Sequence, residues 1–295
     1  MTECIGIIGL GAMGGAMAKR LLAAGYKVNA WARHPEKAAP LVSDGLQLLS
    51  SPQPLFEVSS VLLTNLTTTA DVASVLLGPQ GAVTALKPGS LVIDFSTTDA
   101  AVTKTIAAEL KARQIGFLDA PVSGGQARAQ AGTLSIMVGG EAADLARAQP
   151  LLEVLGKSIR HVGANGSGQV IKACNQMVMC STLLGIAEAV TYAKHFDADI
   201  NTLVSVLSAG LAGSEVLNWA GPKMATGDTS TTIAARLHEK DLRMVLNTLS
   251  TEQLHLPLTE LTSQRLTELI AGGGGDQDTS AVLGIVEKHS KGHQK

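Results

Sequence analysis

Short apolar runs alternate with amphipathic stretches through the first half of the chain. The runs are rich in aliphatic and β-branched residues and mostly continuous, which is typical of strands covered on both faces of a sheet. They occupy residues 5–8, 27–31, 61–63, 91–95, 117–118, 135–138 and 159–162. Between them, residues 101–112 and 141–155 carry apolar positions at helical spacing. The alternation predicts βαβ units around a parallel sheet, which is the α/β fold class.

Strand patterns stop after Gly168, and the rest of the chain shows only helical spacing. Helices are expected at residues 169–194, 199–209, 214–225, about 235–250, 257–271 and 279–289. We therefore expect a Rossmann-type dinucleotide-binding domain at residues 1–165 and an all-helical domain at 166–295 for substrate binding and oligomerisation. A long interdomain helix would join them, and a cleft between two domains is a favoured place for a ligand.

The helix expected at residues 169–194 is apolar almost all the way round, yet it carries Lys172 and, one turn later, Asn175. A helix of this composition belongs in an interior, where a lone ammonium group is costly. Its neighbours in sequence are Val170, Ile171, Met177 and Val178. Such surroundings should lower the pKa of Lys172 and make it a general acid, with Asn175 on the same face to bind the reacting oxygen. A solvated surface lysine is the alternative.

Composition narrows the class of partner. The chain has 23 Lys and Arg against 25 Asp and Glu, so it offers no basic footprint for nucleic acid, and a small molecule is the expected partner. The cysteines Cys4, Cys174 and Cys180 lack CxxC spacing and are expected in the core. His289 and His293 share helical ligand spacing but have no third ligand, so no metal site is expected.

The pattern predicts neither secretion nor membrane insertion. The apolar residues 4–10 follow Glu3, where a signal peptide would need basic residues, and glycines interrupt them. No run reaches the ~18 consecutive apolar residues that a membrane helix needs. A cytoplasmic protein is the expectation.

A glycine-rich turn follows the first expected strand. Residues 9–14 read GLGAMG and lead into a helical pattern, which is the GxGxxG fingerprint of dinucleotide binding. The first glycine permits a tight turn, the second lets a pyrophosphate approach the backbone, and the third lets the helix pack on the strand. The expected cofactor contacts are Gly9, Leu10, Gly11, Ala12, Met13 and Gly14. A glycine-rich turn without a ligand is the alternative.

The end of the second expected strand bears on the choice of cofactor. NAD sites hold an acidic residue here for the ribose hydroxyls, whereas this chain has Arg33 and His34 and no acid before Glu36. A guanidinium can bind a 2′-phosphate through two N–H groups. The sequence therefore favours NADP(H) over NAD(H).

Later strands end in small or hydroxyl-bearing turns, which should converge at the carboxyl edge of the sheet. These turns contain Leu66, Thr67, Ser96, Thr97, Thr98, Ser123, Gly124 and Gly125. In the last turn, two glycine N–H groups and the serine hydroxyl could hold the carboxylate of a small acid. Each turn taken alone is an ordinary loop.

Four segments together resemble the β-hydroxyacid dehydrogenase family. They read GLGAMGGAMAKRL at residues 9–21, DAPVSGG at 119–125, GSGQVIKACNQ at 166–176 and KDL at 240–242. The resemblance runs on to DTSA at 278–281 and so covers nearly the whole chain. It implies hydride transfer between a nicotinamide cofactor and a small β-hydroxy acid or semialdehyde, in a homodimer or homotetramer.

The resemblance also implies roles for single residues. Lys172 falls at the family's catalytic lysine, and Asn175 at its substrate-binding asparagine. Residues 123–125 fall at the loop that holds the substrate carboxylate, and Thr97 falls where nicotinamide and substrate are touched.

Two further positions complete the implied site, and two depart from the family. Lys240 falls at a cofactor-site lysine, and Asp241 is its neighbour in the cleft. Thr67 stands where the family often has proline, a change of the cofactor loop from which we expect little. Ile233 stands where a phenylalanine is common, which leaves the shape of the substrate pocket open.

Within the family, GLAGS at residues 210–214 and GTLSIMVGG at 132–140 are most similar to tartronate semialdehyde reductases, which form D-glycerate. A 3-hydroxyisobutyrate dehydrogenase and a succinic semialdehyde or 4-hydroxybutyrate reductase are the alternatives. Lysine at position 172 separates the chain from the related imine reductases. A non-catalytic cofactor-binding module is an alternative of another class, and such a module would be expected to lose Lys172 or the loop at 123–125.

Overall fold

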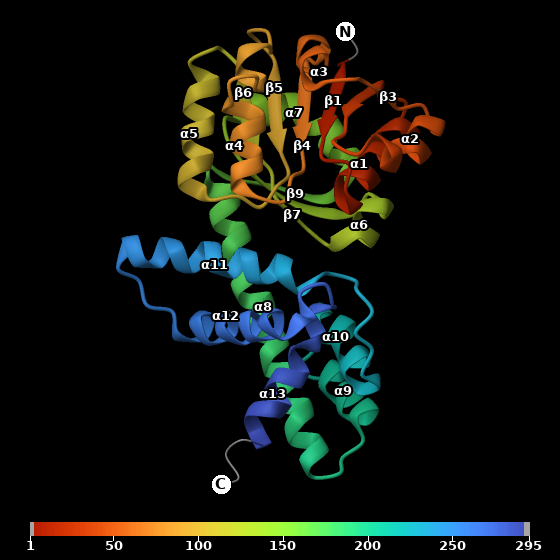
Figure 1. Ribbon diagram of the computed structural model, residues 1–295, viewed down its shortest axis with the longest axis vertical. Coiled ribbons are helices and arrows are strands. Elements are labelled where there is room, and N and C mark those ends of the chain that lie inside the picture. Colours follow the sequence, from red (N-terminus) through yellow and green to blue (C-terminus); the bar gives the residue numbers. More distant parts are fainter. Residues whose placement is uncertain (1–2, 292–295) are drawn as a thin grey trace. The chain divides into compact units, whose positions relative to one another are not determined.

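The computed structural model describes residues 3–291 and divides into two compact units, residues 1–172 and 173–295 (Figure 1). The division lies inside one long helix, further along the chain than the boundary between residues 165 and 166 that the sequence pattern suggests. The first unit has two hydrophobic cores and the second unit has one.

A sheet, nine-stranded in the described part of the chain, forms the first unit, in the order β3-β2-β1-β4-β5-β6-β8-β7 with β9 beside β8. The strands are β1 (Ile5–Ile8), β2 (Val28–Trp31), β3 (Gln47–Leu48), β4 (Val61–Thr64), β5 (Leu91–Asp94), β6 (Gly116–Asp119), β7 (Val122–Ser123), β8 (Leu134–Gly139) and β9 (Gly156–Gly163). Strands β1 to β6 pair in parallel, which confirms the predicted α/β class. The strand order reverses between β1 and β4, and ligands of open α/β sheets bind at such a point.

The last strands depart from the expected parallel arrangement. Strands β6 and β7 both pair antiparallel with β8. Only residues 124–133 connect β7 to β8, and a parallel crossover needs a dozen residues or more. The two-residue strands β3 and β7 are not predicted by the pattern, because two residues show no period.

Helices of the first unit cover both faces of the sheet, and one core lies on each face. They are α1 (Ala12–Ala23), α2 (Ala39–Ser43), α3 (Pro52–Val58), α4 (Thr69–Leu77), α5 (Ala100–Lys111), α6 (Gly125–Ala131) and α7 (Ala142–Leu155). Leu63 of β4 packs in a core with Met17 of α1, whereas its neighbour Leu62 packs in another with Ile106 of α5. Successive strand side chains point to opposite faces, so both faces of β4 are covered and its apolar run is continuous.

The regular elements of the second unit are helices, and an isolated antiparallel bridge joins Ala234 to Asp278 among its described residues. Its helices are α8 (Ser167–His195), which begins in the first unit, α9 (Ile200–Ala209), α10 (Glu215–Thr226), α11 (Ala235–Glu252), α12 (Pro257–Leu269) and α13 (Val282–Lys291). The helix expected at 257–271 ends in a π-helical turn, Ile270–Gly274, where Gly273 has a φ of 88°. Leu184, Leu217, Leu242 and Leu266 share one core.

Helix α8 is 29 residues long and, by length and composition alone, could cross a membrane. The core helix of a folded domain passes the same test, so one such helix is weak evidence. Within three turns α8 also carries Gln169, Lys172, Asn175 and Gln176, and each of these would be costly in lipid.

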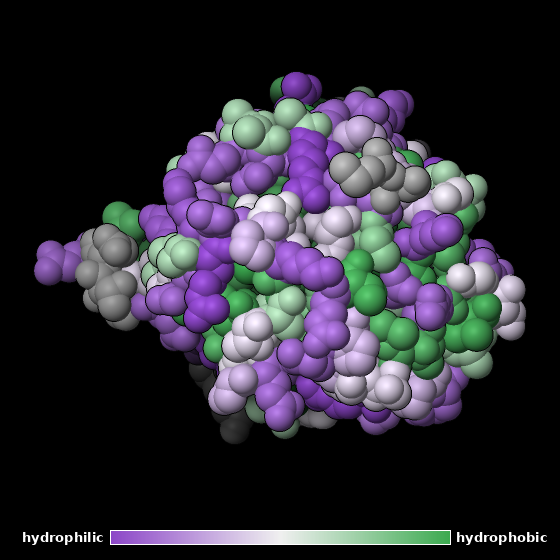
Figure 2. Space-filling view, turned by 90° about the horizontal axis from the view of Figure 1, so that it is seen from above, coloured by the Kyte–Doolittle hydropathy of each residue, from purple (hydrophilic) through white to green (hydrophobic). Residues whose placement is uncertain are grey.

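One side of α8 is exposed although the sequence suggests an interior helix. Ile171, Cys174 and Val178 follow one another at helical spacing and are all exposed. The expected core position of Cys174 is therefore wrong, whereas Cys180 is buried and Cys4 partly buried. In the view from above, hydrophilic side chains cover most of the visible surface, and hydrophobic ones lie among them in small groups (Figure 2).

Candidate active site

The glycine-rich turn after β1 has the shape that a dinucleotide requires. Gly9 has a φ of 101°, and a Cβ atom there would lie 2.1 Å from the carbonyl oxygen of Asn65. A Cβ at Gly14 would lie 2.0 Å from the carbonyl oxygen of Gly9, so α1 packs tightly on the turn. Gly11 precedes α1 with open space around its Cα, and no side chain caps the helix. The uncapped N–H groups of α1 and the open approach at Gly11 fit a pyrophosphate.

Arg33 and His34 lie on the surface after β2, each with a carboxylate nearby. Arg33 Nη2 is 3.6 Å from Asp71 Oδ1, and His34 Nδ1 is 3.5 Å from Glu36 Oε1. Asp71 comes from α4, so sequence order alone could not place an acid beside the arginine. Exposed ion pairs of this kind contribute little to the free energy of folding. Arg33 can therefore exchange Asp71 for a phosphate at a small free-energy cost.

Buried hydrogen bonds join the turns that follow β4 and β5. Thr64 Oγ1 donates to Asp94 Oδ1 at 2.8 Å, and the Ser96 N–H donates to the same oxygen at 3.1 Å. The Leu66 N–H in turn donates to Ser96 Oγ at 2.8 Å. Burial raises the pKa of Asp94 to about 6, against the lowering effect of these hydrogen bonds. These hydrogen bonds therefore connect the two turns that the sequence predicts for cofactor contact. Thr67 is exposed and Thr97 is partly exposed at the tips of these turns.

The loop at residues 123–125 has glycine-specific backbone angles. Gly124 has a φ of 130° and Gly125 a φ of 67°, and the space beside Gly125 is open. Ser123 ends β7 and is partly exposed. The side chain of Arg128 lies against Gly124, where a Cβ would be 2.6 Å from Arg128 Cδ. The aliphatic part of this arginine lies against the predicted carboxylate loop, and sequence reasoning missed the residue.

Lys172 is buried at 8% exposure, but its surroundings differ from those expected. Val170 and Val178 are 49% and 68% exposed, so they do not bury it. Positions three before and four after Lys172 on the same helical face are Gln169 and Gln176, both almost fully buried. The lysine therefore lies on a polar buried face of α8, and the exposed apolar side chains lie on the other side.

In the second unit, a chain of polar contacts joins the three predicted site residues. Asn175 Nδ2 donates to Gln176 Oε1 at 2.9 Å, and Gln176 Nε2 donates to Asp241 Oδ2 at 2.7 Å. Lys240 Nζ forms an ion pair with Asp241 Oδ1 at 2.9 Å. Gln176 and Asp241 are buried. The connecting residue, Gln176, is the one that the sequence pattern did not single out.

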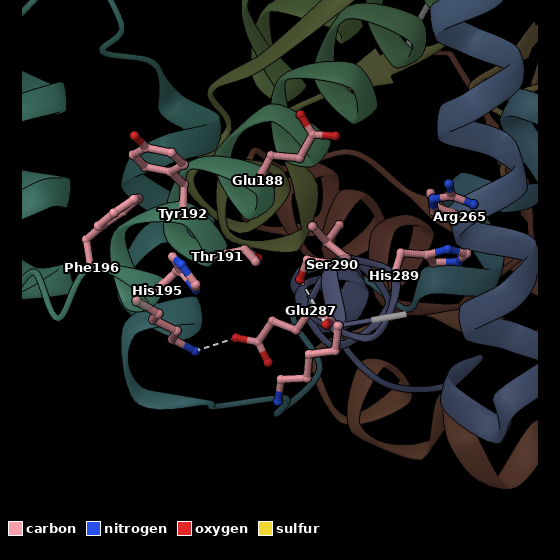
Figure 3. A pocket seen from close by; sticks show the side chains of 12 residues that line it. Glu188, Thr191, Tyr192, His195, Phe196, Arg265, Glu287, His289 and Ser290 are labelled. Atoms are coloured by element: carbon pink, nitrogen blue, oxygen red, sulfur yellow. Dashed lines mark hydrogen bonds and ion pairs between the residues drawn. The ribbon is translucent and has the colours of Figure 1, made fainter. Parts of the chain in front are cut away.

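A pocket of about 1050 Å³ lies elsewhere in the second unit, between α8, α12 and α13 (Figure 3). Tyr192, His195 and Phe196 gather on one side of it, and Arg265 and His289 lie on the other. An ion pair of 2.8 Å joins Lys194 and Glu287 at its edge. None of the predicted site residues lines this pocket, so its size does not make it the candidate site.

Among residues 3–291, no group of three or more His, Cys, Asp or Glu side chains is arranged to hold a metal ion. His289 pairs instead with Glu268, at 2.5 Å between Nε2 and Oε2. His293 lies outside the described residues.

Two family models match the chain, one for each part of the fold. The first is described as the NAD binding domain of 6-phosphogluconate dehydrogenase and matches residues 4–163. The second is described as the NAD-binding domain of NADP-dependent 3-hydroxyisobutyrate dehydrogenase and matches residues 166–286. Together they cover the sheet, α8 and the helices that follow.

Full-length relatives agree with these models. The 2-hydroxy-3-oxopropionate reductase of Escherichia coli (strain K12) is 34% identical, over 96% of this chain and 97% of the reductase. The probable 3-hydroxyisobutyrate dehydrogenase-like 2 of Arabidopsis thaliana is also 34% identical, over 96% and 93% of the two chains. The structure of Psf3 in complex with NADP⁺ and 2-OPP superposes on this chain with a TM-score of 0.89. The two are 25% identical, over 96% of this chain and 99% of that one.

The glycine turn, the carboxyl-edge loops and the buried lysine helix occupy the segments that these models and relatives share. By sequence over nearly its whole length and by fold, the chain belongs to the 3-hydroxyisobutyrate dehydrogenase family of β-hydroxyacid dehydrogenases, which are NAD(P)-dependent oxidoreductases acting on CH–OH groups.

Proposed function

We propose that this protein is an NADPH-dependent reductase of short carboxylated aldehydes, with tartronate semialdehyde, reduced to D-glycerate, as the first candidate. The observation that carries the proposal is Lys172, the one lysine among the described residues that is buried. A buried ammonium group beside a predicted substrate site is a common form of general acid, because burial favours its neutral form and brings its pKa towards the working pH. The relative named 2-hydroxy-3-oxopropionate reductase supports the substrate, because that compound is tartronate semialdehyde.

The proposed cofactor contacts follow the geometry of the first unit. The turn at residues 9–14 would hold the pyrophosphate, and Arg33 with His34 would hold a 2′-phosphate, which favours NADP(H). Leu66, Thr67, Ser96 and Thr97 would line the nicotinamide end, and Lys240 is a further cofactor contact that the family resemblance implies. When bound, the reduced nicotinamide supplies a hydride to the aldehyde carbon.

The chain itself supplies the proton and the orientation. Lys172 donates a proton to the aldehyde oxygen as the alcohol forms, and accepts it back when the alcohol is oxidised. The N–H groups of Gly124 and Gly125 and the Ser123 hydroxyl hold the substrate carboxylate. Asn175 binds the reacting oxygen, and the Gln176 contact fixes the orientation of its amide.

A panel of aldehydes tests this function. NADPH oxidation is measured with tartronate, methylmalonic and succinic semialdehydes, and kcat/KM is expected to be highest for tartronate semialdehyde by about tenfold or more. The highest kcat/KM with methylmalonic semialdehyde would indicate a 3-hydroxyisobutyrate dehydrogenase. The highest kcat/KM with succinic semialdehyde would indicate a reductase that forms 4-hydroxybutyrate. NADPH binding without turnover of any aldehyde would indicate a non-catalytic module.

Assembly and location are part of the same proposal. We expect a homodimer or homotetramer in the cytoplasm, and light scattering after size-exclusion chromatography would measure the stoichiometry. A monomer at assay concentration that turns over normally would contradict the oligomer and leave the chemistry in place.

A further inference from the structure

Gln169 occupies the position one turn before Lys172 on α8, and its side chain is 2% exposed. Its Oε1 accepts from the Thr98 N–H at 3.0 Å, and its Nε2 donates to the carbonyl oxygen of Ser96 at 2.9 Å. Both ends of the amide therefore bind backbone groups of a single loop, on either side of Thr97. A buried amide held at both ends has one orientation, so the loop and the first turn of α8 are fixed to each other.

The same loop is fixed on its other side. Ser96 donates its N–H to Asp94 and accepts from the Leu66 N–H, as described above. Thr98 Oγ1 and Thr103 Oγ1 also lie 2.9 Å apart at the start of α5. The residues before and after Thr97 are thus tied down, while Thr97 itself remains partly exposed.

Asp119 fixes the start of α8 to the end of β6. Its Oδ1 accepts from the Gly166 N–H at 2.8 Å, and its Oδ2 accepts from the Gln169 N–H at 3.2 Å. The carboxylate is fully buried, and a Cβ at Gly168 would lie 2.7 Å from it. An acid at a helix N-terminus satisfies N–H groups that have no partner within the helix. Helix α8 therefore cannot rotate or slide at its first turn without breaking these contacts.

We propose that Gln169 is a positioning residue for the reaction: it holds the Thr97 loop, where cofactor and substrate are expected, at a fixed place relative to the turn of α8 that carries Lys172. This inference rests on the proposed function for its chemistry. Among the described residues, the Gln169 side chain binds the backbone of residues 96 and 98, and its N–H binds the carboxylate of Asp119, so we assign Gln169 no direct contact with the reactants. Its loss should alter the fit of the nicotinamide and the proton transfer more than the capture of substrate.

The variant Gln169→Leu removes both side-chain hydrogen bonds at nearly constant volume. It leaves the Ser96 carbonyl and the Thr98 N–H buried without their partner. We expect the Kd for NADPH, measured by nucleotide fluorescence without substrate, to rise about tenfold, and kcat to fall about 10²-fold. KM for the semialdehyde should change less than about threefold, since the loop at 123–125 is untouched.

The variant Gln169→Glu separates positioning from mere packing. A protonated carboxylic acid can still donate to the Ser96 carbonyl and accept from the Thr98 N–H, whereas a carboxylate can only accept and would face the Ser96 oxygen. Asp119, which accepts from the Gln169 N–H, and burial should raise the pKa of the introduced carboxyl, whereas the positive charge of Lys172, one turn along the same face, should lower it. The ratio of variant to wild-type kcat should therefore be highest at acidic pH and fall as pH rises.

A control from the opposite edge of the sheet measures the effect of lost stability alone. Arg147 binds the carbonyl oxygens of Gly89 and Ser60, at the amino ends of β5 and β4, and pairs with Glu3. Arg147→Met should lower Tm as much as Gln169→Leu does, yet leave the Kd for NADPH unchanged.

The outcomes are distinct. Wild-type NADPH affinity in Gln169→Leu, or a pH-independent activity ratio in Gln169→Glu, would overturn the positioning role. A wild-type protein that turns over no aldehyde would refute the proposed function, while the fluorescence measurement would still decide whether Gln169 holds the cofactor loop.

Discussion

Two buried glutamines, one in each unit, hold their parts of the candidate site in different ways. Gln169 in the first unit binds backbone atoms of the loop after β5. Gln176 in the second unit binds the side chains of Asn175 and Asp241. Backbone groups keep their positions whatever the residue type, whereas side chains can find other partners. The first unit therefore has a rigid frame for the site, and the second a set of exchangeable contacts.

The largest effect is expected at Lys172, the last residue of the first unit. Lys172→Ala should lower kcat by about 10³-fold, since general acid catalysis contributes 10² to 10⁴. NADPH affinity should stay within about threefold, because the alanine removes the proton donor and none of the backbone contacts that hold the loops. Single-turnover kinetics and nucleotide fluorescence measure the two effects.

The matched variants are Lys157→Ala and Asn175→Ala. Lys157 is an exposed lysine of β9, and its loss should leave kcat unchanged. Asn175→Ala, in the second unit, should cost only about tenfold, because the amide assists the proton transfer and does not perform it. Near-normal turnover by Lys172→Ala would remove the lysine from the mechanism.

Carboxyl groups in the two units should respond to pH in opposite directions. Burial raises the pKa of Asp94 to about 6 in the first unit, above the unfolded value of 3.8. The folded state then holds a proton that the unfolded chain releases, so the free energy of unfolding falls as pH rises from about 4 to about 6, by at most about 2–3 kcal/mol. In the second unit, hydrogen bonds from Ser230 lower the pKa of Asp228 to about 2. Its contribution is present above pH 3.8 and is lost as pH falls towards 2.

The two tryptophans allow each unit to be followed separately, because Trp31 lies in the first unit and Trp219 in the second. Urea titrations of Trp219→Phe report on the first unit and those of Trp31→Phe on the second. Asp94→Asn should flatten the acidic-to-neutral slope of the first unit only. Equal slopes of the same sign in both units would contradict the assignment.

The preference for NADPH over NADH should depend on residues of the first unit alone. Arg33→Ala is expected to raise the Kd for NADPH about tenfold, because the guanidinium supplies a charge-assisted contact to the 2′-phosphate, and to leave the Kd for NADH unchanged. Arg113→Ala, another exposed arginine of the same unit, is the control for net charge. A wild-type protein that already prefers NADH tenfold would contradict the NADP(H) proposal.

The comparison also explains which parts of the site the sequence predicts. Strand runs and the glycine turn are local patterns, so the fold class and the position of the dinucleotide turn follow from the residues themselves. Thr98 lies 71 residues from Gln169 and Asp241 lies 65 residues from Gln176, and no spacing predicts such contacts. The surroundings that the sequence predicts for Lys172 are wrong for a related reason. An almost uniformly apolar helix does not reveal which side is buried. Around Lys172 the buried side of α8 is polar, whereas further along the helix it is apolar.

The smallest expected effect is that of removing the Gln176 side-chain contact, and it tests the difference between the two units directly. Gln176→Leu removes the amide contact to Asp241, but the ion pair of Asp241 with Lys240 at 2.9 Å remains. The carboxylate keeps a charged partner, so we expect kcat/KM to fall only about fivefold, against about 10²-fold in kcat for Gln169→Leu, which leaves two backbone groups without any replacement. The double variant Gln176→Leu with Lys240→Met should lose much more than the sum of the single losses, because Asp241 is then buried without a partner. Additive losses, or a Gln176→Leu defect as large as that of Gln169→Leu, would show that side-chain contacts in the second unit are as rigid as the backbone contacts in the first.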